Sequence, residues 1–374
     1  MNSKNQQFSS PAYLQLEDST VFTGFSFGSS VNNDGEVVFN TGMVGYPESL
    51  TDPSYRGQIL TYTYPLIGNY GVPDKKTNKF ESDKIQVRGV IVSQYEHEYS
   101  HHEARLSLHE WLSRYDIPAI TGIDTRALTK RLREHGVMLG KIVQGKPKPT
   151  DLKKKKINIE DPSLTNIVTE VSVQESVWCA KKNKYKILLV DCGVKQNIIR
   201  NLVDRNCAVK RVPWDYDFTN ELDEFDGLFI SNGPGDPKMC KATIKHVRKA
   251  LEMNIPQFGI CLGSQIQGLA AGAQTYKLKY GHRGQNQPCV LLNTKKAILT
   301  SQNHGYAVCE KSIPKDWNVL YRNANDYSVE GLRHKMKPFF SVQFHPESFP
   351  GPLEANVLFD EFIDLVKIYK DTKK

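Results

Sequence analysis

The second half of the chain repeats one pattern, in which a short apolar run ends at a turn and a segment with helical periodicity follows. The runs at 186–191, 227–231 and 256–260 have the length and composition of buried strands. Strand–turn–helix units in series predict a doubly wound, mostly parallel sheet covered by helices on both faces. Ligands bind beyond the carboxyl ends of the strands in such sheets, so we expect functional residues directly after these runs.

The first half predicts a smaller mixed β/α domain. Short strands at 21–22 and 37–39 flank the turn residues NNDG at 32–35, and 87–92 has the pattern of a buried strand. The stretch 39–71 mixes glycine, proline and serine with aromatic residues and has no helical period. It is therefore expected to be a loop that closes the sheet or lines a site.

Two helices are also expected in the first half. The apolar residues of one recur at helical spacing and are Ala104, Leu108, Trp111 and Leu112. Those of the other, Leu128 and Leu132, follow Asp124 or Thr125 as the N-cap and precede Gly136 as the stop.

A lysine-rich connector, GKPKPTDLKKKK at 145–156, separates the two halves. Its two prolines and its charge run are expected to stop both helix and strand, which predicts a solvated linker. The expected domains are therefore 12–145 and 185–368, with 146–184 as linker and connection.

Composition limits the functions that the chain can have. Its 374 residues suit two domains, and no apolar run is long enough for a membrane span. The net charge of +8 comes from 141–156, which sums to +6, and 367–374, which sums to +3. Neither stretch spreads its charge over a folded surface, and the connector contains no aromatic residue, so we expect no nucleic-acid partner.

The cysteines and the first residues indicate a cytoplasmic protein. Seven cysteines without CxxC spacing argue against a disulfide framework and a structural zinc site. The first ten residues, MNSKNQQFSS, contain no apolar core of a secretory signal.

One cysteine has the surroundings of a nucleophile. The segment 259–263, GICLG, has the form G-x-C-x-G at a strand-to-helix turn, which is a nucleophile elbow with sulfur in place of oxygen. Its glycines permit the tight turn, and the helix N-terminus that follows favours a thiolate at Cys261. The N–H of Leu262 is one candidate oxyanion donor, and the loop at 233–235 can supply a second.

A thiolate nucleophile needs an imidazole and a group that orients it, and both follow the apolar run 339–344. His345 stands at the end of this predicted strand, and Glu347 is two residues further along. Pro346 favours an extended backbone at His345, so that the two side chains point to the same side.

Three alternative motifs are weaker. Cys192 also follows a strand, but it lacks a preceding glycine and its neighbour Asp191 disfavours a thiolate. His97 to His101 fit H-E-x-x-H, but the segment is a polar loop rather than a zinc-binding helix. The segment 136–141 resembles a phosphate-binding P-loop that is one residue short, so no nucleotide site is expected in this chain.

The motifs FGICLGSQ, SNGPGDP, TSQNHG and SVQFHPE together resemble the class I (triad) glutamine amidotransferases, whose fold is flavodoxin-like. TGMVGYPESLTDPSYRGQIL, YPLIGNYG, GIDTRALTKRLREHG, DCGVKQNIIRNL, YGHRGQNQP and ANDYSVEGL are similar to the glutamine-dependent small subunit of carbamoyl-phosphate synthase. YPLIGNYG and LREHG are closer to the pyrimidine-pathway type, with the arginine-pathway type as the alternative.

This resemblance implies a triad of Cys261, His345 and Glu347. It also implies contacts with the substrate L-glutamine from eight residues, which are Ser54, Gly233, Gly235, Leu262, Gln265, Asn303, Gly305 and Tyr306. Two positions depart from the family, because Ser264 replaces its usual His and Tyr306 its usual Phe. A backbone contact would survive the change at Tyr306, and we expect Ser264 to tune activity rather than abolish it.

The resemblance further implies a γ-glutamyl thioester intermediate and transfer of ammonia through an internal tunnel to a large synthetase subunit or domain. ATP and Mg²⁺ would act only on that partner, and this chain would bind no cofactor or metal. Two alternatives remain, which are a stand-alone γ-glutamyl thiol hydrolase and a catalytically impaired regulatory subunit. The sequence also leaves open whether the chain is a separate subunit or part of a multifunctional polypeptide.

Overall fold

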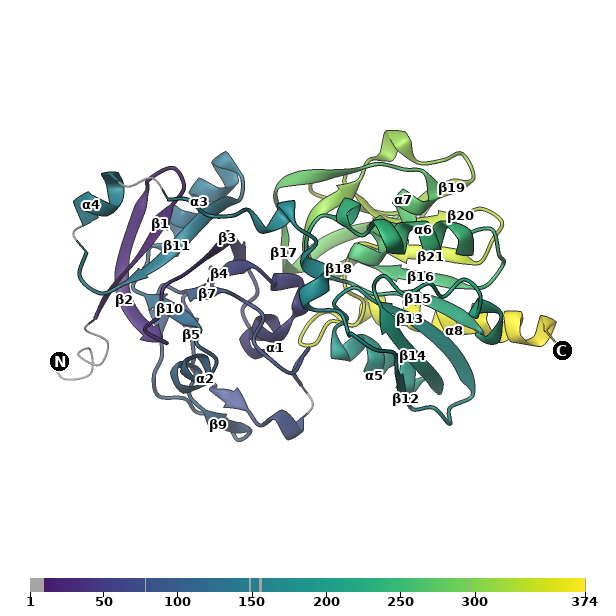
Figure 1. Cartoon of the computed structure of the whole chain (residues 1–374), viewed down its shortest axis with the longest axis horizontal. Coiled ribbons are helices and arrows are strands. Elements are labelled where there is room, and N and C mark those ends of the chain that lie inside the picture. Colours follow the sequence, from purple (N-terminus) through teal and green to yellow (C-terminus); the bar gives the residue numbers. More distant parts are fainter. Residues whose placement is uncertain (1–9, 78, 148, 155–156, 295, 374) are drawn as a thin grey trace. The chain divides into compact units, whose positions relative to one another are not determined.

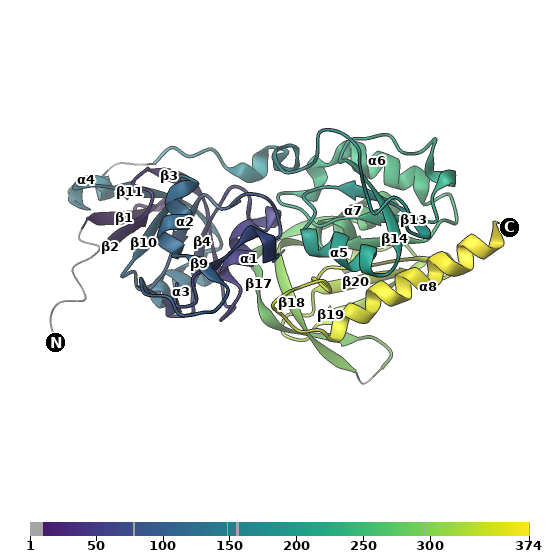
Figure 2. The same cartoon turned by 90° about the horizontal axis from the view of Figure 1, so that it is seen from below.

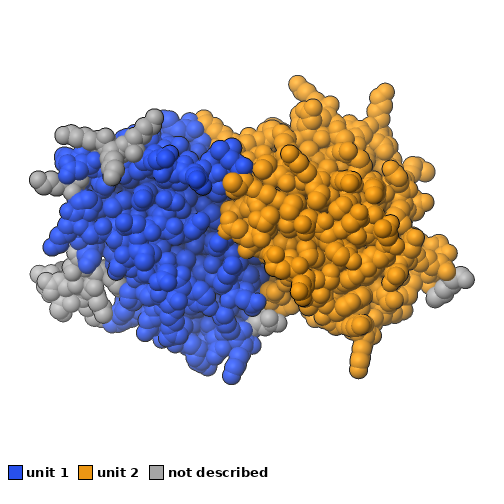
Figure 3. All heavy atoms as spheres, in the orientation of Figure 1, with its two compact units in different colours: residues 1–164 blue, residues 165–374 orange. Residues whose placement is uncertain are grey.

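The computed structural model divides the chain into two compact units, residues 1–164 and 165–374 (Figure 3). The residues whose structure is described are 10–77, 79–147, 149–154, 157–294 and 296–373. The N-terminal stretch considered above as a signal, residues 1–9, lies outside them, as do Lys148, Lys155 and Lys156 of the connector.

The first unit is built on a closed barrel. Among the described residues its strands follow the order β1 (Pro11–Leu16), β11 (Met138–Gln144), β3 (Asn33–Asn40), β4 (Gln58–Tyr62), β7 (Gly89–Ile91), β10 (Pro118–Thr121) and β2 (Val21–Gly28). The pairs from β3 through β4 and β7 to β10 are parallel, and the other pairs are antiparallel. The mixed character was predicted, whereas the closure of the sheet was not.

Two expectations for the first unit were wrong. NNDG does not join two neighbouring strands, because β3 begins at Asn33 and pairs with β11 and β4, while β2 pairs with β1 and β10. The stretch 39–71 is not all loop, since it contains α1 (Tyr46–Thr51) and the central strand β4. Pro47 is tolerated in the first turn of α1, and β4 is buried at four of its five residues, so neither element shows a clear sequence period.

The two expected helices are confirmed as α2 (Leu108–Arg114) and α3 (Thr125–His135). The Asp124 carboxylate caps α3 by accepting from the N–H of Ala127 at 2.8 Å, and Gly136 ends it at φ 99°. Ala104 is not part of α2 and lies in the short strand β9 (Ala104–Leu106).

The connector is not free of regular structure, which corrects the expectation that its prolines stop a helix. Residues Pro149–Lys154 form α4. Proline is compatible with the first helical position, because its missing N–H would have no partner there.

The second unit contains one sheet of ten strands among the described residues (Figure 1). Their order is β12 (Val177–Cys179), β14 (Cys207–Pro213), β13 (Tyr185–Asp191), β15 (Gly227–Ile230), β16 (Gln257–Ile260), β21 (Phe339–Val342), β20 (Val329–His334), β19 (Trp317–Asn323), β17 (Thr275–Leu291) and β18 (Ala297–Val308). The run β14–β13–β15–β16–β21 is parallel, as predicted. The antiparallel extension from β20 to β18 was not predicted.

Helices cover both faces of the parallel strands, which confirms the doubly wound arrangement. Ile187 and Leu189 of β13 pack in one core with α5 (Gln196–Asp204) and α8 (Val357–Thr372). The alternate residues Leu188 and Val190 pack in another core with α6 (Lys241–Ala250) and α7 (Leu262–Ala271). Figure 2 shows α6 and α8 on opposite sides of this sheet.

Part of the stretch expected to be linker folds with the second unit. Strand β12 pairs with β14, and Val168 belongs to the same buried core as α6 and α7. No helix in the described part of the chain is long and apolar enough to cross a membrane.

Candidate active site

Cys261 lies at the turn between β16 and α7, as the elbow motif predicts. Its backbone has φ 54° and ψ −105°, a conformation that L-residues rarely adopt and that costs roughly 1–3 kcal/mol. Its N–H donates to the carbonyl of Val342 in β21 at 2.8 Å, and its Sγ lies 3.7 Å from the carbonyl oxygen of Asn303. The thiol is thus held at the carboxyl ends of two neighbouring parallel strands.

The glycines of the elbow are required by close backbone contacts. A Cβ on Gly263 would lie 2.1 Å from the carbonyl oxygen of Ile230, and one on Gly259 would lie 2.7 Å from that of Gly263. Gly233 is equally confined, because its Cβ would lie 2.0 Å from the carbonyl oxygen of Cys192. The same Cβ would lie 2.8 Å from the Leu262 side chain, so the loop after β15 packs against the start of α7.

His345 and Glu347 follow β21 and form the expected pair. The Nδ1 of His345 is 2.7 Å from the Oε1 of Glu347, and both side chains are buried. The carboxylate accepts a hydrogen bond from the Nδ1–H, so Nε2 is the ring nitrogen that can interact with the thiol. Nε2 has no hydrogen-bond partner among the described residues. Cys261 is one of the groups that raise the pKa of this imidazole.

Lys195 is a member of this cluster that the sequence analysis missed. Its Nζ lies 3.1 Å from the Oε1 of Glu347, and its backbone N–H donates to Asn232 at 3.0 Å. Lys195 is 6% exposed and precedes α5, four residues after β13 ends. A lysine that soon follows a strand of a parallel sheet was the available signal, but Lys195 lies four residues beyond the strand rather than directly after it.

Burial and pairing set the charges of the cluster. Burial lowers the pKa of His345, but the Glu347 carboxylate outweighs burial and the net effect raises that pKa to about 10. Burial raises the pKa of Glu347, but Lys195 and His345 outweigh it and hold that pKa at about 2. At neutral pH the site therefore holds a carboxylate between an ammonium and an imidazolium.

Strand β18 and helix α7 contain most of the expected glutamine contacts. Asn303 contacts Cys261 as described above, and Gly305 and Tyr306 follow it in β18. The Nε2 of Gln265 donates to the carbonyl of Tyr306 at 2.8 Å and to Gln343 at 3.0 Å. A contact through the backbone of Tyr306 would be the same for Phe, which is the family's usual residue.

Two other expected contacts lie on other segments of the chain. Gly235 has φ +86° and lies in the loop after β15 near Ile167, in the second unit. Ser54 belongs to the first unit, where it is buried in a 3-10 turn and its N–H donates to Asp52 at 2.9 Å. The contact of Ser54 with glutamine stays a prediction.

The rival nucleophile Cys192 is chemically unsuited. A hydrogen bond with Cys240, full burial and the charge of Asp191 raise its pKa well above that of an ordinary thiol. Ser264 stands where the family usually has His. It is buried, and its hydroxyl shares a hydrogen bond of 2.9 Å with the Ser341 hydroxyl of β21. It therefore joins α7 to the sheet.

The two other alternative motifs do not have the structures that their functions need. Residues 97–101 form a bend rather than a helix, so His97 and His101 do not share a helix face. Residues 136–141 span the end of α3 and the start of β11, whereas a P-loop precedes a helix.

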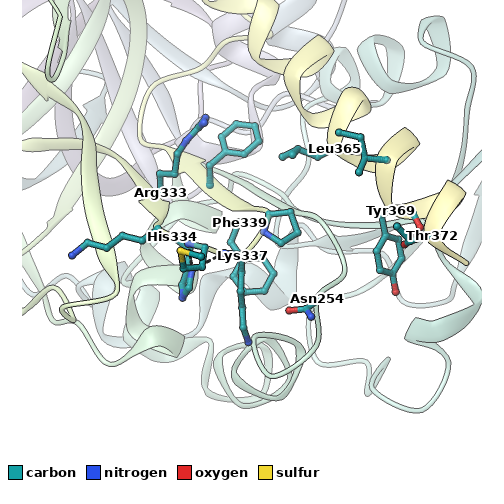
Figure 4. Close-up of a pocket in the computed structure, with 13 residues that line it drawn as sticks. Asn254, Arg333, His334, Lys337, Phe339, Leu365, Tyr369 and Thr372 are labelled. Carbon is teal, nitrogen blue, oxygen red and sulfur yellow. Dashed lines mark hydrogen bonds between the residues drawn. The ribbon is translucent and has the colours of Figure 1, made fainter.

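A separate hollow lies between the β20–β21 turn and α8 (Figure 4). Its volume is about 430 Å³, and Lys337, Phe339 and Tyr369 are among the residues that line it. It includes none of the triad residues, so it is separate from the candidate active site.

Comparison with known families agrees with this geometry. Residues 188–365 match the family "Glutamine amidotransferase class-I", which defines the class of the second unit. Residues 14–142 match the family "Carbamoyl-phosphate synthase small chain, CPSase domain". The chain belongs to the family of carbamoyl-phosphate synthase small chains.

Individual relatives are of two kinds. The "Carbamoyl phosphate synthase arginine-specific small chain" of Neosartorya fischeri is 47% identical, over 96% of this chain and 80% of its own. The "Multifunctional protein CAD" of Squalus acanthias is 50% identical over 96% of this chain, and "Multifunctional protein pyr1-3" of Dictyostelium discoideum is 48% identical over 94%. The chain spans 16% and 17% of the length of these two multifunctional relatives. These identities do not separate the arginine type from the pyrimidine type.

Proposed function

We propose that this chain is the glutaminase component of a carbamoyl-phosphate synthase. It would hydrolyse L-glutamine to glutamate and ammonia at Cys261. The observation that carries this proposal is the convergence of a strained cysteine elbow after β16 with a buried His345–Glu347 pair after the adjacent strand β21. Membership of the family supports L-glutamine as the substrate and carbamoyl phosphate synthesis as the use of the ammonia.

The proposed reaction is acyl transfer through sulfur. The Cys261 thiolate attacks the side-chain amide carbon of glutamine, and the N–H groups of Leu262 and the 233–235 loop stabilise the oxyanion. His345 gives its Nε2 proton to the amine as the carbon–nitrogen bond breaks, so ammonia leaves and a γ-glutamyl thioester remains. Water then loses a proton to His345 and attacks the thioester, and the carbon–sulfur bond breaks to release glutamate and restore the Cys261 thiolate beside protonated His345.

The wider setting is also part of the proposal. Ammonia would pass to a large synthetase subunit or domain, where bicarbonate and ATP with Mg²⁺ would yield carbamoyl phosphate, while this chain itself would use no cofactor. A reducing cytoplasm suits this chemistry, and all seven cysteines are free thiols in the structure. The product would feed pyrimidine synthesis, as the YPLIGNYG and LREHG motifs suggest, with arginine synthesis as the alternative.

Substitution of the nucleophile tests the chemistry. We expect Cys261→Ser to lower glutamate release by on the order of 10⁴-fold or more, because hydroxyl replaces a thiolate in the bond-forming step. Cys192→Ser is the matched control and is expected to retain activity. Intact glutaminase activity in Cys261→Ser would contradict the assignment of the nucleophile.

Addition of the synthetase tests the coupling and the two alternatives. We expect the glutaminase rate to rise when a large synthetase subunit engaged with ATP and bicarbonate is added. A high glutaminase rate that is the same with and without the synthetase would favour a stand-alone γ-glutamyl thiol hydrolase. A chain without glutaminase activity under either condition would instead be a regulatory subunit.

A further inference from the structure

A second cluster of chemistry-bearing side chains lies in the antiparallel extension of the second unit. His282 of β17 and His304 of β18 are directly opposed across the two strands, and Glu330 of β20 lies beside them. All three residues are buried. The His282 Nδ1 lies 3.2 Å from the His304 Nε2 and 3.3 Å from the Glu330 Oε1, and the last two atoms are 3.7 Å apart.

The outer nitrogen of each imidazole already has an acceptor. The Nε2 of His282 lies 2.8 Å from the Asp326 carboxylate, and the Nδ1 of His304 lies 2.8 Å from the carbonyl oxygen of Tyr306. Each outer nitrogen donates its proton to that acceptor, which leaves the inner nitrogen as the atom that a metal could bind. The two inner nitrogens face each other and the Glu330 carboxylate.

Gln302 places a further oxygen atom beside His304. Its Oε1 lies 3.1 Å from the His304 Nε2. The amide orientation is fixed because its Nε2 donates to the Thr300 hydroxyl oxygen at 3.1 Å and to the sulfur of Cys289 at 3.3 Å. The Thr300 hydroxyl donates its own hydrogen bond to the carbonyl of Gln287 at 2.8 Å, so its oxygen acts as the acceptor for Gln302.

The ligand atoms of His282, His304 and Glu330 lie close enough together to hold one metal ion, and the Gln302 amide oxygen lies beside His304. We propose that His282, His304, Glu330 and Gln302 bind a divalent cation of the zinc class. A tetrahedral ion with bonds of about 2.0–2.1 Å separates its ligand atoms by about 3.3–3.4 Å, and the observed separations lie around this value. Two imidazoles with a carboxylate and an amide oxygen suit zinc better than calcium or magnesium.

Two further observations support a metal. Asp326 and the Tyr306 carbonyl hold the outer imidazole protons, which is how the ligands of protein zinc sites are oriented. The second carboxylate oxygen of Glu330, Oε2, is buried and has no hydrogen-bond partner among the described residues. An ion at this point would neutralise that buried charge.

The position of the site predicts a structural role. Four protein ligands close the coordination shell, as in structural zinc sites. His304 stands between Asn303 and Gly305 in β18, the strand whose Asn303 carbonyl contacts the Cys261 sulfur. The ion would therefore fix this strand without taking part in glutamine hydrolysis.

Metal analysis of the full chain tests the proposal. We expect protein purified without a metal-affinity tag or chelator to contain about one zinc per chain by elemental analysis. After the metal is stripped, Co²⁺ should bind with one-to-one stoichiometry and give the visible absorption of a tetrahedral nitrogen–oxygen site. A shared proton in place of the metal would give metal-free protein that does not bind Co²⁺, and this result would overturn the proposal.

Variants distinguish this site from adventitious binding by the cysteines. We expect His282→Ala and Glu330→Gln to abolish stoichiometric Co²⁺ binding, and Asp326→Asn to weaken it by about 10–100-fold. Asp326 is partly exposed, so its variant serves where a core variant fails to fold. His334→Ala, in the same strand as Glu330 but paired with Asp316, is the control that should bind normally. Metal binding that is unchanged in His282→Ala and Asp326→Asn would assign the metal elsewhere and overturn the proposal.

Discussion

At the scale of the residue, the triad is governed by one buried carboxylate with two cationic partners. Glu347 accepts from His345 and pairs with Lys195 through the same oxygen, Oε1. Such a carboxylate fixes the imidazole tautomer and stabilises the imidazolium. The triad was predicted from the spacing of the motifs, whereas Lys195 was found only when the ends of β13 and β21 were brought together.

Removal of the Glu347 charge tests this role through pH. We expect Glu347→Gln to lower kcat/KM for glutamine hydrolysis by on the order of 10²–10⁴-fold. Because the carboxylate raises the pKa of His345, its loss should move the alkaline limb of the pH profile of kcat/KM to lower pH. An alkaline limb at the same pH as in the wild type would show that Glu347 does not act on His345.

The same substitution should also change how the free energy of unfolding depends on pH. The folded-state pKa of Glu347 is lowered from 4.5 to about 2, so its stabilising effect is present above pH 4.5 and is lost as pH falls toward 2. The wild type should therefore lose more unfolding free energy than Glu347→Gln across this window. Urea unfolding at several pH values measures the difference.

Lys195 allows a test of a buried ion pair against a partly buried one. We expect Lys195→Met to lower the free energy of unfolding by about 3 kcal/mol, because it leaves Glu347 buried beside only one cation. Lys210→Met is the matched control, since Lys210 and its partner Glu221 are both partly exposed, and we expect a smaller loss. Equal losses in urea unfolding would refute the special role of the buried pair.

At the scale of the element, the elbow depends on the packing of α7 against the ends of β15 and β16. The motif predicted the turn correctly, and the structure gives the reason why glycine is needed. The backbone of Ile230 passes so close to Gly263 that no side chain fits. Errors at this scale occurred where local composition indicated a loop. In α4 a proline fits the first helical position, and in the 39–71 stretch the buried strand β4 shows no sequence period.

A pair of glycine substitutions in α7 tests the elbow packing. We expect Gly263→Ala to cost about 3 kcal/mol of stability, because its Cβ would collide with the carbonyl of Ile230. Gly268→Ala, in the same helix, meets only side-chain atoms at 3.2 Å and beyond and should change stability by less than about 1 kcal/mol. Thermal unfolding of the two variants measures the difference, and similar values would contradict the proposed collision.

At the scale of the whole molecule, the division into two units predicts where the chain can be cut. The second compact unit begins at Thr165, and its core includes Val168 and the edge strand β12. We expect a fragment of residues 165–374 to unfold cooperatively. A fragment that begins at 185 should be less stable, since each large apolar side chain removed from a core costs about 1.5–3 kcal/mol.

Urea unfolding of the two fragments measures this difference. Trp178 stacks on Phe225 in the longer fragment, so its fluorescence reports directly on the retained segment. Equal midpoints for the two fragments would show that residues 165–184 act as a linker, as the sequence alone suggested.

The sequence by itself determined the parallel α/β core, the nucleophile elbow and the His345–Glu347 pair. These features rest on local patterns, namely apolar runs, glycines around a cysteine, and a two-residue spacing in extended chain. The tertiary structure alone decided the closure of the first sheet into a barrel, the antiparallel extension of the second, the place of Lys195 and the His282–His304–Glu330 cluster. Each of these depends on residues that are distant in sequence, whose contact is set by strand pairing and register rather than by local pattern.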